Sequence, residues 1–392
     1  MKINIWKDYK YMELPEVLSF IVDNRGKSVP LDKKGEHKLI ATNCIRNEYL
    51  YPTYEKIRFL NDDTYQNWFR AHPIPGDIIF VNKGTPGRVC MVPDPVDFCI
   101  AQDMMAFRVD SSIIYNKYLF AVLRNSRIQK QIEATTVGDV IPHFKKQQLK
   151  EIKIPIPPMR IQKLIGDVYF SFCQKEEINN RINRNLSEQA EALYRKMILD
   201  GSGEHRECVL SDIADIVMGQ SPKGDTYNDD GDGVVFYQGR AEFGERFPTR
   251  RLFTTDPKRM AKENSVLMSV RAPVGDINVA YEECCIGRGL CSVSSKDNHQ
   301  SFILYTMYSL KDKLDVYNGE GTVFGSINKD SMKCMTINVP NKELMDKFEE
   351  IARPMDAMIK ANYDENCRLV AMRDGLLLKL MSGELDVSEA DI

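Results

Sequence analysis

The sequence has no apolar run of 18 residues, so it contains no candidate for a transmembrane helix. Its first residues, 1–8, also lack the apolar core of a secretory signal. Hydrophobic residues make up 43% and charged residues 28% of the 392 positions, which is typical of an ordinary globular protein with two or three domains. We therefore expect no membrane association and a cytoplasmic location.

The cysteines and histidines do not have the spacing that is typical of metal sites or disulfide frameworks. The ten cysteines contain no C-x-x-C pair, and the five histidines show no ligand spacing with each other or with cysteine. A loop beginning at Asn228 matches the start of a calcium-binding loop, but its twelfth position is Gly239, where a bidentate glutamate is required. We expect reduced cysteines and no bound metal.

Motifs of nucleotide, methyl-transfer and nuclease sites are also missing. R-G-K-S at 25–28 resembles a phosphate loop, but Ile21 stands where that loop has a glycine. An N-P-P-Y-like loop, which would hold a flipped base, is absent, so such chemistry would belong to a partner. E-I-K at 151–153 has the spacing of a nuclease acid and lysine, but C-M-T at 334–336, its counterpart in the repeat described below, lacks both groups.

The net charge of −3 is distributed unevenly along the chain. Residues 1–155 carry 23 Lys and Arg against 18 Asp and Glu, a net charge of +5. Residues 341–392 carry 7 against 12, a net charge of −5. The overall charge therefore does not exclude a nucleic-acid partner, because the acid is concentrated at the C-terminal end and the first globular part is basic.

Residues 149–201 form the most informative stretch of the sequence. L-K-E-I-K-I-P-I-P-P at 149–158 places apolar residues mostly at every second position, which predicts a half-buried strand over 150–156 that the prolines end. The residues that follow contain no proline and keep apolar side chains at three-four spacing up to Gly201, which predicts a helix over 159–200. Such a helix would be about 60 Å long, so it needs a partner helix along its side.

The same pattern returns 183 positions later. M-K-C-M-T-I-N-V-P at 332–340 matches the segment at 149–157, and a second apolar heptad segment follows it and ends at Ser382-Gly383. The two long helices can pack on each other as a coiled coil, or each can pack on its own domain, and we expect the first arrangement.

The globular segments ahead of the two helices repeat in the same order of elements. The period of 183 positions indicates a duplicated domain and is too long for a solenoid repeat. Each copy is expected to have an opening helix at 14–21 or 210–217, a strand at 78–81 or 265–269, and a helix at 116–133 or 301–313.

This duplicated plan resembles the specificity subunit of type I restriction–modification systems over essentially the whole chain. The residues that carry the resemblance are I-K-I-P-I-P-P at 152–158, I-N-V-P at 337–340, G-Q-S-P-K at 219–223 and G-D-G-V-V-F-Y-Q-G at 231–239. These strings are weak one by one, but they are specific in this order and in two copies.

The resemblance implies an α+β fold with an internal pseudo-two-fold repeat. Two tandem mixed α/β target-recognition domains would be joined by two long helices that form an antiparallel coiled coil. The expected boundaries are 1–155 for the first target-recognition domain, 156–204 for the central spacer helix, 205–340 for the second target-recognition domain and 341–392 for the C-terminal spacer helix and tail.

The resemblance also implies a function in phage defence, namely sequence-specific binding of double-stranded DNA at a bipartite, asymmetric site. This chain would not be an enzyme by itself. It would direct methyltransferase subunits, two in number, and restriction subunits that act as translocases. S-adenosylmethionine, ATP and magnesium are expected on those partner subunits, and no cofactor is expected on this chain.

DNA reading requires polar side chains on loops for base edges and cations for phosphates. Arginine pairs with guanine, and glutamine or asparagine with adenine, through two hydrogen bonds. The first domain supplies the candidates Arg25, Lys27, Lys56, Arg58, Lys83, Thr85, Arg88, Gln102, Thr136 and His143. The second supplies Gln220, Lys223, Tyr237, Gln238, Arg240, Arg246, Arg250, Arg271, Arg288, Thr322 and Asn328.

Two other functions stay open. One is DNA recognition within another phage-defence methyltransferase system, which differs only in the partner. The other is a coiled-coil scaffold that binds proteins and no nucleic acid, which the acidic second half favours. The scaffold predicts that both sets of polar loops tolerate alanine substitution without loss of activity.

Overall fold

The structure is a computed structural model that describes residues 4–24, 28–138, 141–201, 205–318 and 325–385. The chain divides into two compact units. The first unit consists of residues 1–181 and 362–392, and the second unit of residues 182–361. None of the helices in the described ranges is both long and apolar enough to cross a membrane.

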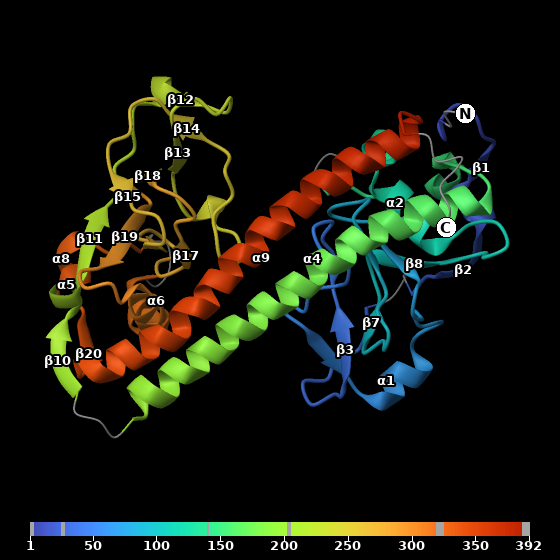
Figure 1. The fold of residues 1–392 in the computed structure, drawn as a ribbon. Helices are drawn as coiled ribbons and strands as arrows, with labels where there is room; N and C mark the ends of the chain where they lie inside the picture. The colour runs from blue at the N-terminus through green and yellow to red at the C-terminus, as the bar shows by residue number, and fades with distance from the viewer. Residues whose placement is uncertain (1–3, 25–27, 139–140, 202–204, 319–324, 386–392) are drawn as a thin grey trace. The chain divides into compact units, whose positions relative to one another are not determined.

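The first unit contains a four-stranded antiparallel sheet, a three-stranded sheet and one strand pair (Figure 1). The four-stranded sheet has the order β2 (Leu18–Val22), β8 (Met104–Val109), β5 (Ile78–Val81) and β6 (Val89–Met91). The three-stranded sheet has the order β4 (Arg58–Leu60), β3 (His37–Ile40) and β7 (Phe98–Ile100), and the pair joins β1 (Tyr11–Glu13) to β9 (Lys153–Pro155). The helices are α1 (Asp62–Asn67), α2 (Asn116–Arg124) and α3 (Ser126–Thr135), with 3-10 turns η1 (Leu14–Val17), η2 (Thr42–Cys44) and η3 (Lys146–Glu151).

Strand β5 is buried on both faces, which explains its uninterrupted apolar sequence. Ile78 and Phe80 point into a core that also contains α2, α3 and the start of the first long helix. Ile79 and Val81 point into a second core on the opposite face of the sheet. This alternation follows from the two-residue period of a strand.

The second unit repeats this plan with a larger second sheet. Its four-stranded sheet has the order β11 (Ala214–Met218), β19 (Leu290–Ser295), β16 (Val266–Ser269) and β17 (Ile277–Val279). A mixed sheet has the order β12 (Tyr227–Asn228), β14 (Phe253–Thr254), β13 (Val234–Tyr237), β18 (Cys284–Ile286) and β15 (Met260–Ala261), and the strand pair joins β10 (His205–Val209) to β20 (Thr336–Pro340). The helices are α5 (Leu210–Ile213), α6 (Gln300–Ser309), α7 (Lys311–Asp315) and α8 (Lys329–Lys333), with 3-10 turns η5 (Gly224–Thr226), η6 (Arg240–Glu242) and η7 (Val316–Asn318). The expected internal repeat is confirmed by this correspondence.

The two long helices are α4 (Met159–Tyr194) and α9 (Lys342–Ser382). Helix α4 has 36 residues and α9 has 41, and a π-helical turn, η4 (Arg195–Leu199), continues α4. The long helix expected over 159–200 is thus confirmed, with its last turn changed in geometry.

The helices pack on each other in antiparallel fashion within each unit. In the first unit, the Asn179 side-chain amide donates to Glu365 (2.7 Å) and to Asn366 (2.9 Å). In the second unit, the ring of Tyr194 packs against that of Phe348, with centroids 5.5 Å apart. Within the first unit, Glu176 contacts Arg373 and Asn179 contacts Asn366, so the contact moves backward along α9 as it moves forward along α4, as an antiparallel coiled coil requires.

Five predicted elements differ from the structure at their boundaries. The opening helices expected at 14–21 and 210–217 are single turns, η1 and α5, and the following residues are strands β2 and β11. The helix expected at 116–133 is broken after Arg124, and the one expected at 301–313 is broken after Ser309. The strand expected over 150–156 begins only at Lys153, because η3 occupies the preceding residues.

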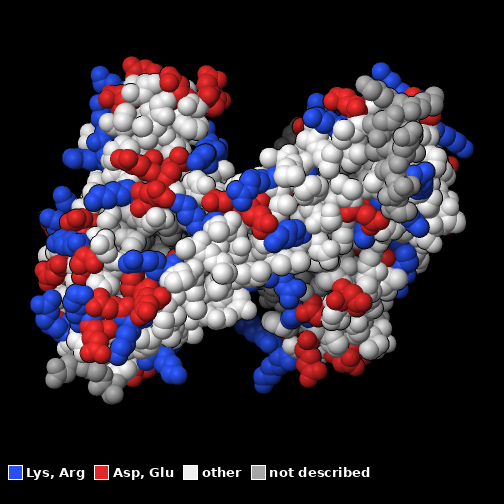
Figure 2. All heavy atoms as spheres, in the orientation of Figure 1, with Lys and Arg blue, Asp and Glu red and all other residues white. Residues whose placement is uncertain are grey.

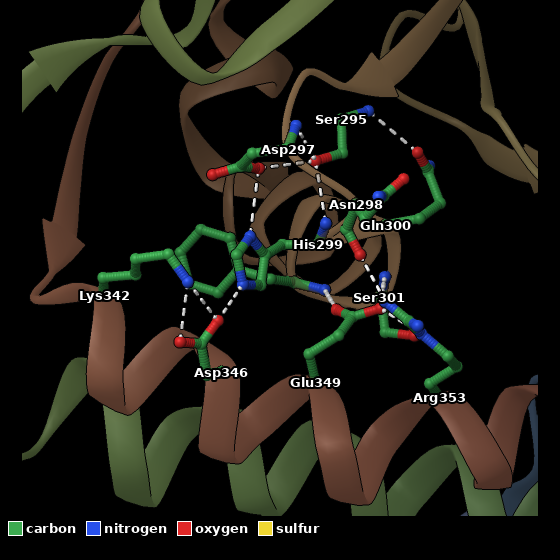
Figure 3. A network of polar contacts seen from close by, with 11 residues as sticks. Ser295, Asp297, Asn298, His299, Gln300, Ser301, Lys342, Asp346, Glu349 and Arg353 are labelled. Atoms are coloured by element: carbon green, nitrogen blue, oxygen red, sulfur yellow. Dashed lines mark hydrogen bonds and ion pairs between the residues drawn. The ribbon is translucent and has the colours of Figure 1, made fainter.

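Helix α6 of the second unit is capped by a carboxylate from the neighbouring helix α9 (Figure 3). Glu349 is almost fully buried and accepts hydrogen bonds from the backbone N–H groups of Ser301 (3.3 Å) and Phe302 (3.0 Å). Arg353 donates from Nε to the same carboxylate (3.1 Å). Because free N–H groups and the helix dipole both favour an anion at a helix N-terminus, this contact fixes α6 against α9.

His299, beside this cap, lies between two carboxylates. Its Nδ1 is 3.0 Å from Asp297 and its Nε2 is 2.7 Å from Asp346, which also accepts from Lys342. Burial lowers the pKa of His299, but the hydrogen bonds with Asp297 and Asp346 outweigh burial and raise that pKa above 6.5. An imidazolium, which hydrogen-bonds Asp346 through Nε2 and forms an ion pair with Asp297, matches this geometry.

We expect the second unit to lose stability as pH rises through the folded-state pKa of His299. The contribution is fully present below pH 6.5, where folded and unfolded chains both carry the charge, and disappears above the raised pKa. The loss of stability is measured by urea unfolding between pH 5.5 and 8.5. Hydrogen exchange of α6 peptides over the same pH range shows whether it occurs in the second unit. His299→Gln is the control and should flatten the pH profile, and an equally steep profile in this variant would contradict the assignment.

Candidate nucleic-acid interface

Three loops of the first unit meet at one end of its four-stranded sheet, where β5 ends and β8 begins. The backbone N–H of Asn82 donates to the carbonyl of Asp103 (2.9 Å), and the N–H of Phe144 donates to the carbonyl of Asn82 (2.7 Å). The N–H of Gly84 donates to the carbonyl of Pro142 (2.9 Å). Residues 82–88, 101–103 and 141–144 are called the first loop cluster below.

The second unit has the same arrangement, with the same three backbone hydrogen bonds. The N–H of Val270 donates to the carbonyl of Gly289 (2.9 Å), and the N–H of Ile327 donates to the carbonyl of Val270 (3.1 Å). The N–H of Ala272 donates to the carbonyl of Gly325 (3.0 Å). Residues 219–221, 238–239, 270–272, 287–289 and 325–328 are called the second loop cluster.

Glycine allows the loops of the second cluster to pack backbone against backbone. A Cβ atom on Gly219 would clash with the carbonyl oxygen of Gly287, so the loops after β11 and β18 approach without side chains between them. The side chains of the neighbouring residues Gln220, Gln238 and Arg288 are exposed to solvent as a result.

Each cluster has a positively charged residue at the equivalent position of its backbone. Lys83 forms an isolated antiparallel bridge with His143, and Arg271 forms the equivalent bridge with Ser326. Lys83 lies 3.8 Å from Asp103, whereas no carboxylate within the described ranges lies at ion-pair distance from Arg271. The two clusters thus share a backbone and differ in the side chains that they present.

The structure brings five predicted residues of the first domain together in the first loop cluster, namely Lys83, Thr85, Arg88, Gln102 and His143. Thr85 and Gln102 are exposed, and the other three are half-buried.

Other predicted residues of the first domain lie apart from the cluster or have a local partner. Thr136 precedes the last loop, and its hydroxyl donates to the carbonyl of Ile132 (2.7 Å) within the helical turn. Lys56 precedes the edge strand β4, and Arg58 lies on it. Among the described residues, no hydrogen bond joins Lys56 or Arg58 to the first loop cluster.

In the second unit, Gln220, Gln238, Arg271 and Arg288 lie in the second loop cluster with exposed side chains. Lys223 is also exposed, and it lies two residues after the 219–221 loop of this cluster.

Three further predicted residues of the second unit are exposed but have intramolecular partners. Arg240 pairs with Asp276, and Arg250 donates to Glu282 (2.5 Å). Asn328 caps α8 by accepting from the backbone N–H of Ser331 (2.8 Å). These contacts compete with DNA for the same groups.

Two predicted DNA contacts have side chains that are buried in the structure. Tyr237 is fully buried on β13, so its ring has no access to a base. The Arg246 side chain is 10% exposed and pairs with Asp356, and its Nη1 lies 3.5 Å from the Tyr308 hydroxyl. Arg246 therefore stabilises the packing of α9 within the second unit.

Arg25, Lys27 and Thr322 lie outside the described residues, so their positions stay predictions. Lys145 and Lys146, which are not among the predicted residues, are exposed directly after the first loop cluster. The signal that points to this region is the recurrence of lysine 183 positions apart, at Lys146 and Lys329.

No group of three or more metal-binding side chains occurs in the described ranges. The acid and lysine considered for a nuclease do not form a site with each other, because Lys153 pairs with Glu13 at 2.8 Å. Figure 2 shows Lys and Arg interspersed with Asp and Glu over both units on the face that it draws. The distribution of charge on this face therefore does not identify a DNA-binding surface. The candidate interface is identified by the exposed polar side chains of the two loop clusters.

Comparisons with known proteins give a consistent assignment. The sequence profile of the type I restriction modification DNA specificity domain matches this chain twice, at residues 8–188 and 205–365. A Methanocaldococcus jannaschii protein provisionally named the type I restriction enzyme MjaX specificity subunit is 27% identical, over 97% of this chain and 94% of its own length. The type I restriction enzyme HindI specificity subunit of Haemophilus influenzae is 20% identical, over 79% of this chain and 86% of its own length.

A solved structure has the same fold. The S subunit of a type I restriction–modification system from M. genitalium is 16% identical, with a TM-score of 0.58 over 97% of this chain and 98% of that one. The two profile matches cover most of the chain, one in each half, as the repeated architecture requires. The chain therefore belongs to the type I restriction–modification specificity subunit family and carries two copies of the DNA specificity domain.

Proposed function

We propose that this chain binds double-stranded DNA at a bipartite, asymmetric sequence and directs partner methyltransferase and restriction subunits to it. The observation that carries the proposal is the pair of loop clusters, which share three backbone hydrogen bonds and present different side chains. A duplicated frame with different polar groups is what two half-sites of different sequence need.

The chemistry of the exposed groups supports base reading. Arg271 and Arg288 offer guanidinium groups suited to guanine, and Gln220 and Gln238 offer amides suited to adenine. The first cluster offers Lys83, Thr85, Gln102 and His143 instead. The two half-sites are therefore expected to differ, and the one read by the second cluster to contain guanine.

The long helices would set the gap between the half-sites. In this proposal, residues 1–155 and 205–340 are the target-recognition domains, and 156–204 and 341–392 supply the spacer. The unread gap should then change with helix length and leave the half-sites unchanged.

Catalysis would belong to the partners. Two methyltransferase subunits would bind S-adenosylmethionine, and restriction subunits would bind ATP and magnesium, in the cytoplasm. The repeat supports two methyltransferase subunits, because duplicated surfaces on one chain offer two equivalent docking sites.

Single-molecule methylation mapping tests the proposal, in cells that express this chain with its cognate methyltransferase subunit. We expect a new methylated motif with two short halves and an unread gap, which disappears when this chain is deleted. A soluble complex that methylates no new motif would favour the coiled-coil scaffold.

A further inference from the structure

A groove of about 550 Å³ lies on the second unit, beside β11 and β19. Its floor contains small side chains, among them Ser292 of β19, and its walls carry lysines from three different segments. The lysines are Lys262, Lys296, Lys329 and Lys333, and among the described residues one acidic residue, Asp215, lines the groove.

The groove has an excess of positive charge that is not neutralised locally. All four lysines are exposed, and Lys296 donates to the backbone carbonyl of Ser211 (2.5 Å), which leaves its charge uncompensated. Within the described ranges, Lys262, Lys329 and Lys333 have no carboxylate at ion-pair distance. Four cations against one carboxylate make a site for a ligand with several negative charges.

The sheet face that carries the groove differs between the repeats. In the first unit, the position equivalent to Ser294 is Arg108, as the registers of β2 with β8 and β11 with β19 indicate. Arg108 fills the face of its sheet by pairing with Asp77 (2.9 Å) and by lying 5.3 Å from the ring centre of Phe20. Serine leaves this space open in the second unit.

Two of the lysines are common to both repeats. Lys329 and Lys333 of α8 stand 183 positions after Lys146 and Lys150 of η3, and both helical turns precede the strand that leads into a long helix. All four side chains are exposed. A pair of lysines at this turn is therefore part of the repeated plan.

Two segments that line the groove lead directly into the second loop cluster. Asn328, the last residue of that cluster, caps α8, so Lys329 follows it directly. Strand β11 lines the groove with Ala214 and Val217 and then leads into Gln220 of the same cluster. DNA that contacts the cluster would have its backbone beside the lysines.

We propose that this lysine groove binds the phosphates of the DNA that flanks the half-site read by the second loop cluster. The inference rests on the proposed DNA-binding function and adds the phosphate contacts of one half-site. The lysines contribute affinity that is independent of sequence, because phosphates carry no base information.

The test uses the full chain in complex with its methyltransferase subunit and a duplex that carries the mapped motif. The association constant is measured as a function of salt for the wild type and for K329Q/K333Q. Each lost phosphate contact should reduce the slope of log K against log salt by about 0.9, so the slope of the variant should be shallower by about 2. The methylated motif should stay unchanged.

The matched control is K258Q/K347Q, which removes two exposed lysines of the second unit that pair with Asp256 and Glu343. Its salt slope should equal that of the wild type. An unchanged slope in K329Q/K333Q would overturn the groove assignment, as would an equal loss in the control. A wild-type complex with no specific DNA binding would instead overturn the proposed function.

Discussion

Arg373→Ala is expected to lower the free energy of unfolding of the first unit by about 3–5 kcal/mol. Arg373 of α9 donates from Nη1 to both carboxylate oxygens of Glu176 on α4, at 3.0 and 3.1 Å. The two side chains are 10% and 7% exposed, and the guanidinium lies 5.6 Å from the ring centre of Tyr169. Removal of the arginine leaves a buried carboxylate without its hydrogen-bonded cation, with only the more distant charge of Arg124 acting on it, and this is the costly way to break an ion pair.

The state of Glu176 supports this expectation. Burial raises the pKa of Glu176, and the charge of Arg373 acts in the opposite direction. Without Arg373 the carboxylate should be protonated more readily. The difference in stability between the wild type and the variant should therefore be smaller at low pH than at neutral pH.

Urea unfolding measured by tryptophan fluorescence checks this prediction. The chain has two tryptophans, Trp6 and Trp68, and both belong to the first unit. The control is E176M/R373M, which replaces the pair by apolar side chains of similar length and should recover most of the stability. A double variant as unstable as Arg373→Ala would show that the buried charge is not the cause.

Phe348→Ala is expected to lower the free energy of unfolding of the second unit by about 3–5 kcal/mol. Phe348 of α9 is fully buried, and its ring centre is 5.5 Å from that of Tyr194, 5.7 Å from that of Tyr305 and 6.4 Å from that of Phe302. Truncation leaves a cavity at the point where α4, α6 and α9 meet, and these rings also lose their edge-to-face contacts.

Hydrogen exchange monitored by mass spectrometry measures the effect on α6 and on the N-terminal part of α9. The control is Met358→Ala on the same helix, which removes a side chain that is 52% exposed and should change stability by no more than about 0.5 kcal/mol. Faster exchange in the Met358 variant than in the Phe348 variant would contradict the packing described here.

The repeat and the long helices could be predicted from the sequence because they leave periodic signals. Apolar residues at heptad spacing predicted α4 and α9, and the segment leading into α4 recurs before α9. The opening helices could not be assigned correctly in the same way. Leu14, Val17, Leu18 and Ile21 have helical spacing, yet the chain leaves the helix after Val17, because Leu18–Val22 pairs with β8. Tertiary pairing overrides a local pattern of this length.

That several of the predicted residues lie together on loops agrees with the structure, but the burial of single residues could not be predicted. Arg246 and Asp356 are 110 positions apart in the chain, and no local signal indicates that their side chains pair. Tyr237 lies in the string that carries the family resemblance, but the alternation of a short strand does not reveal that both faces are covered. The lysine groove was missed because its four lysines come from three separate segments.

The most direct measurement of the central claim is methylation mapping of three strains in parallel, with the wild-type chain, with Lys83→Ala and with Arg271→Ala. If the two loop clusters read separate half-sites, each variant should relax or lose one half of the motif and leave the other half and the gap unchanged. At the base pair that the substituted residue reads, the discrimination against other bases should fall by about 1–3 kcal/mol. A variant that alters both halves equally, or two variants that methylate the wild-type motif at wild-type levels, would contradict the claim.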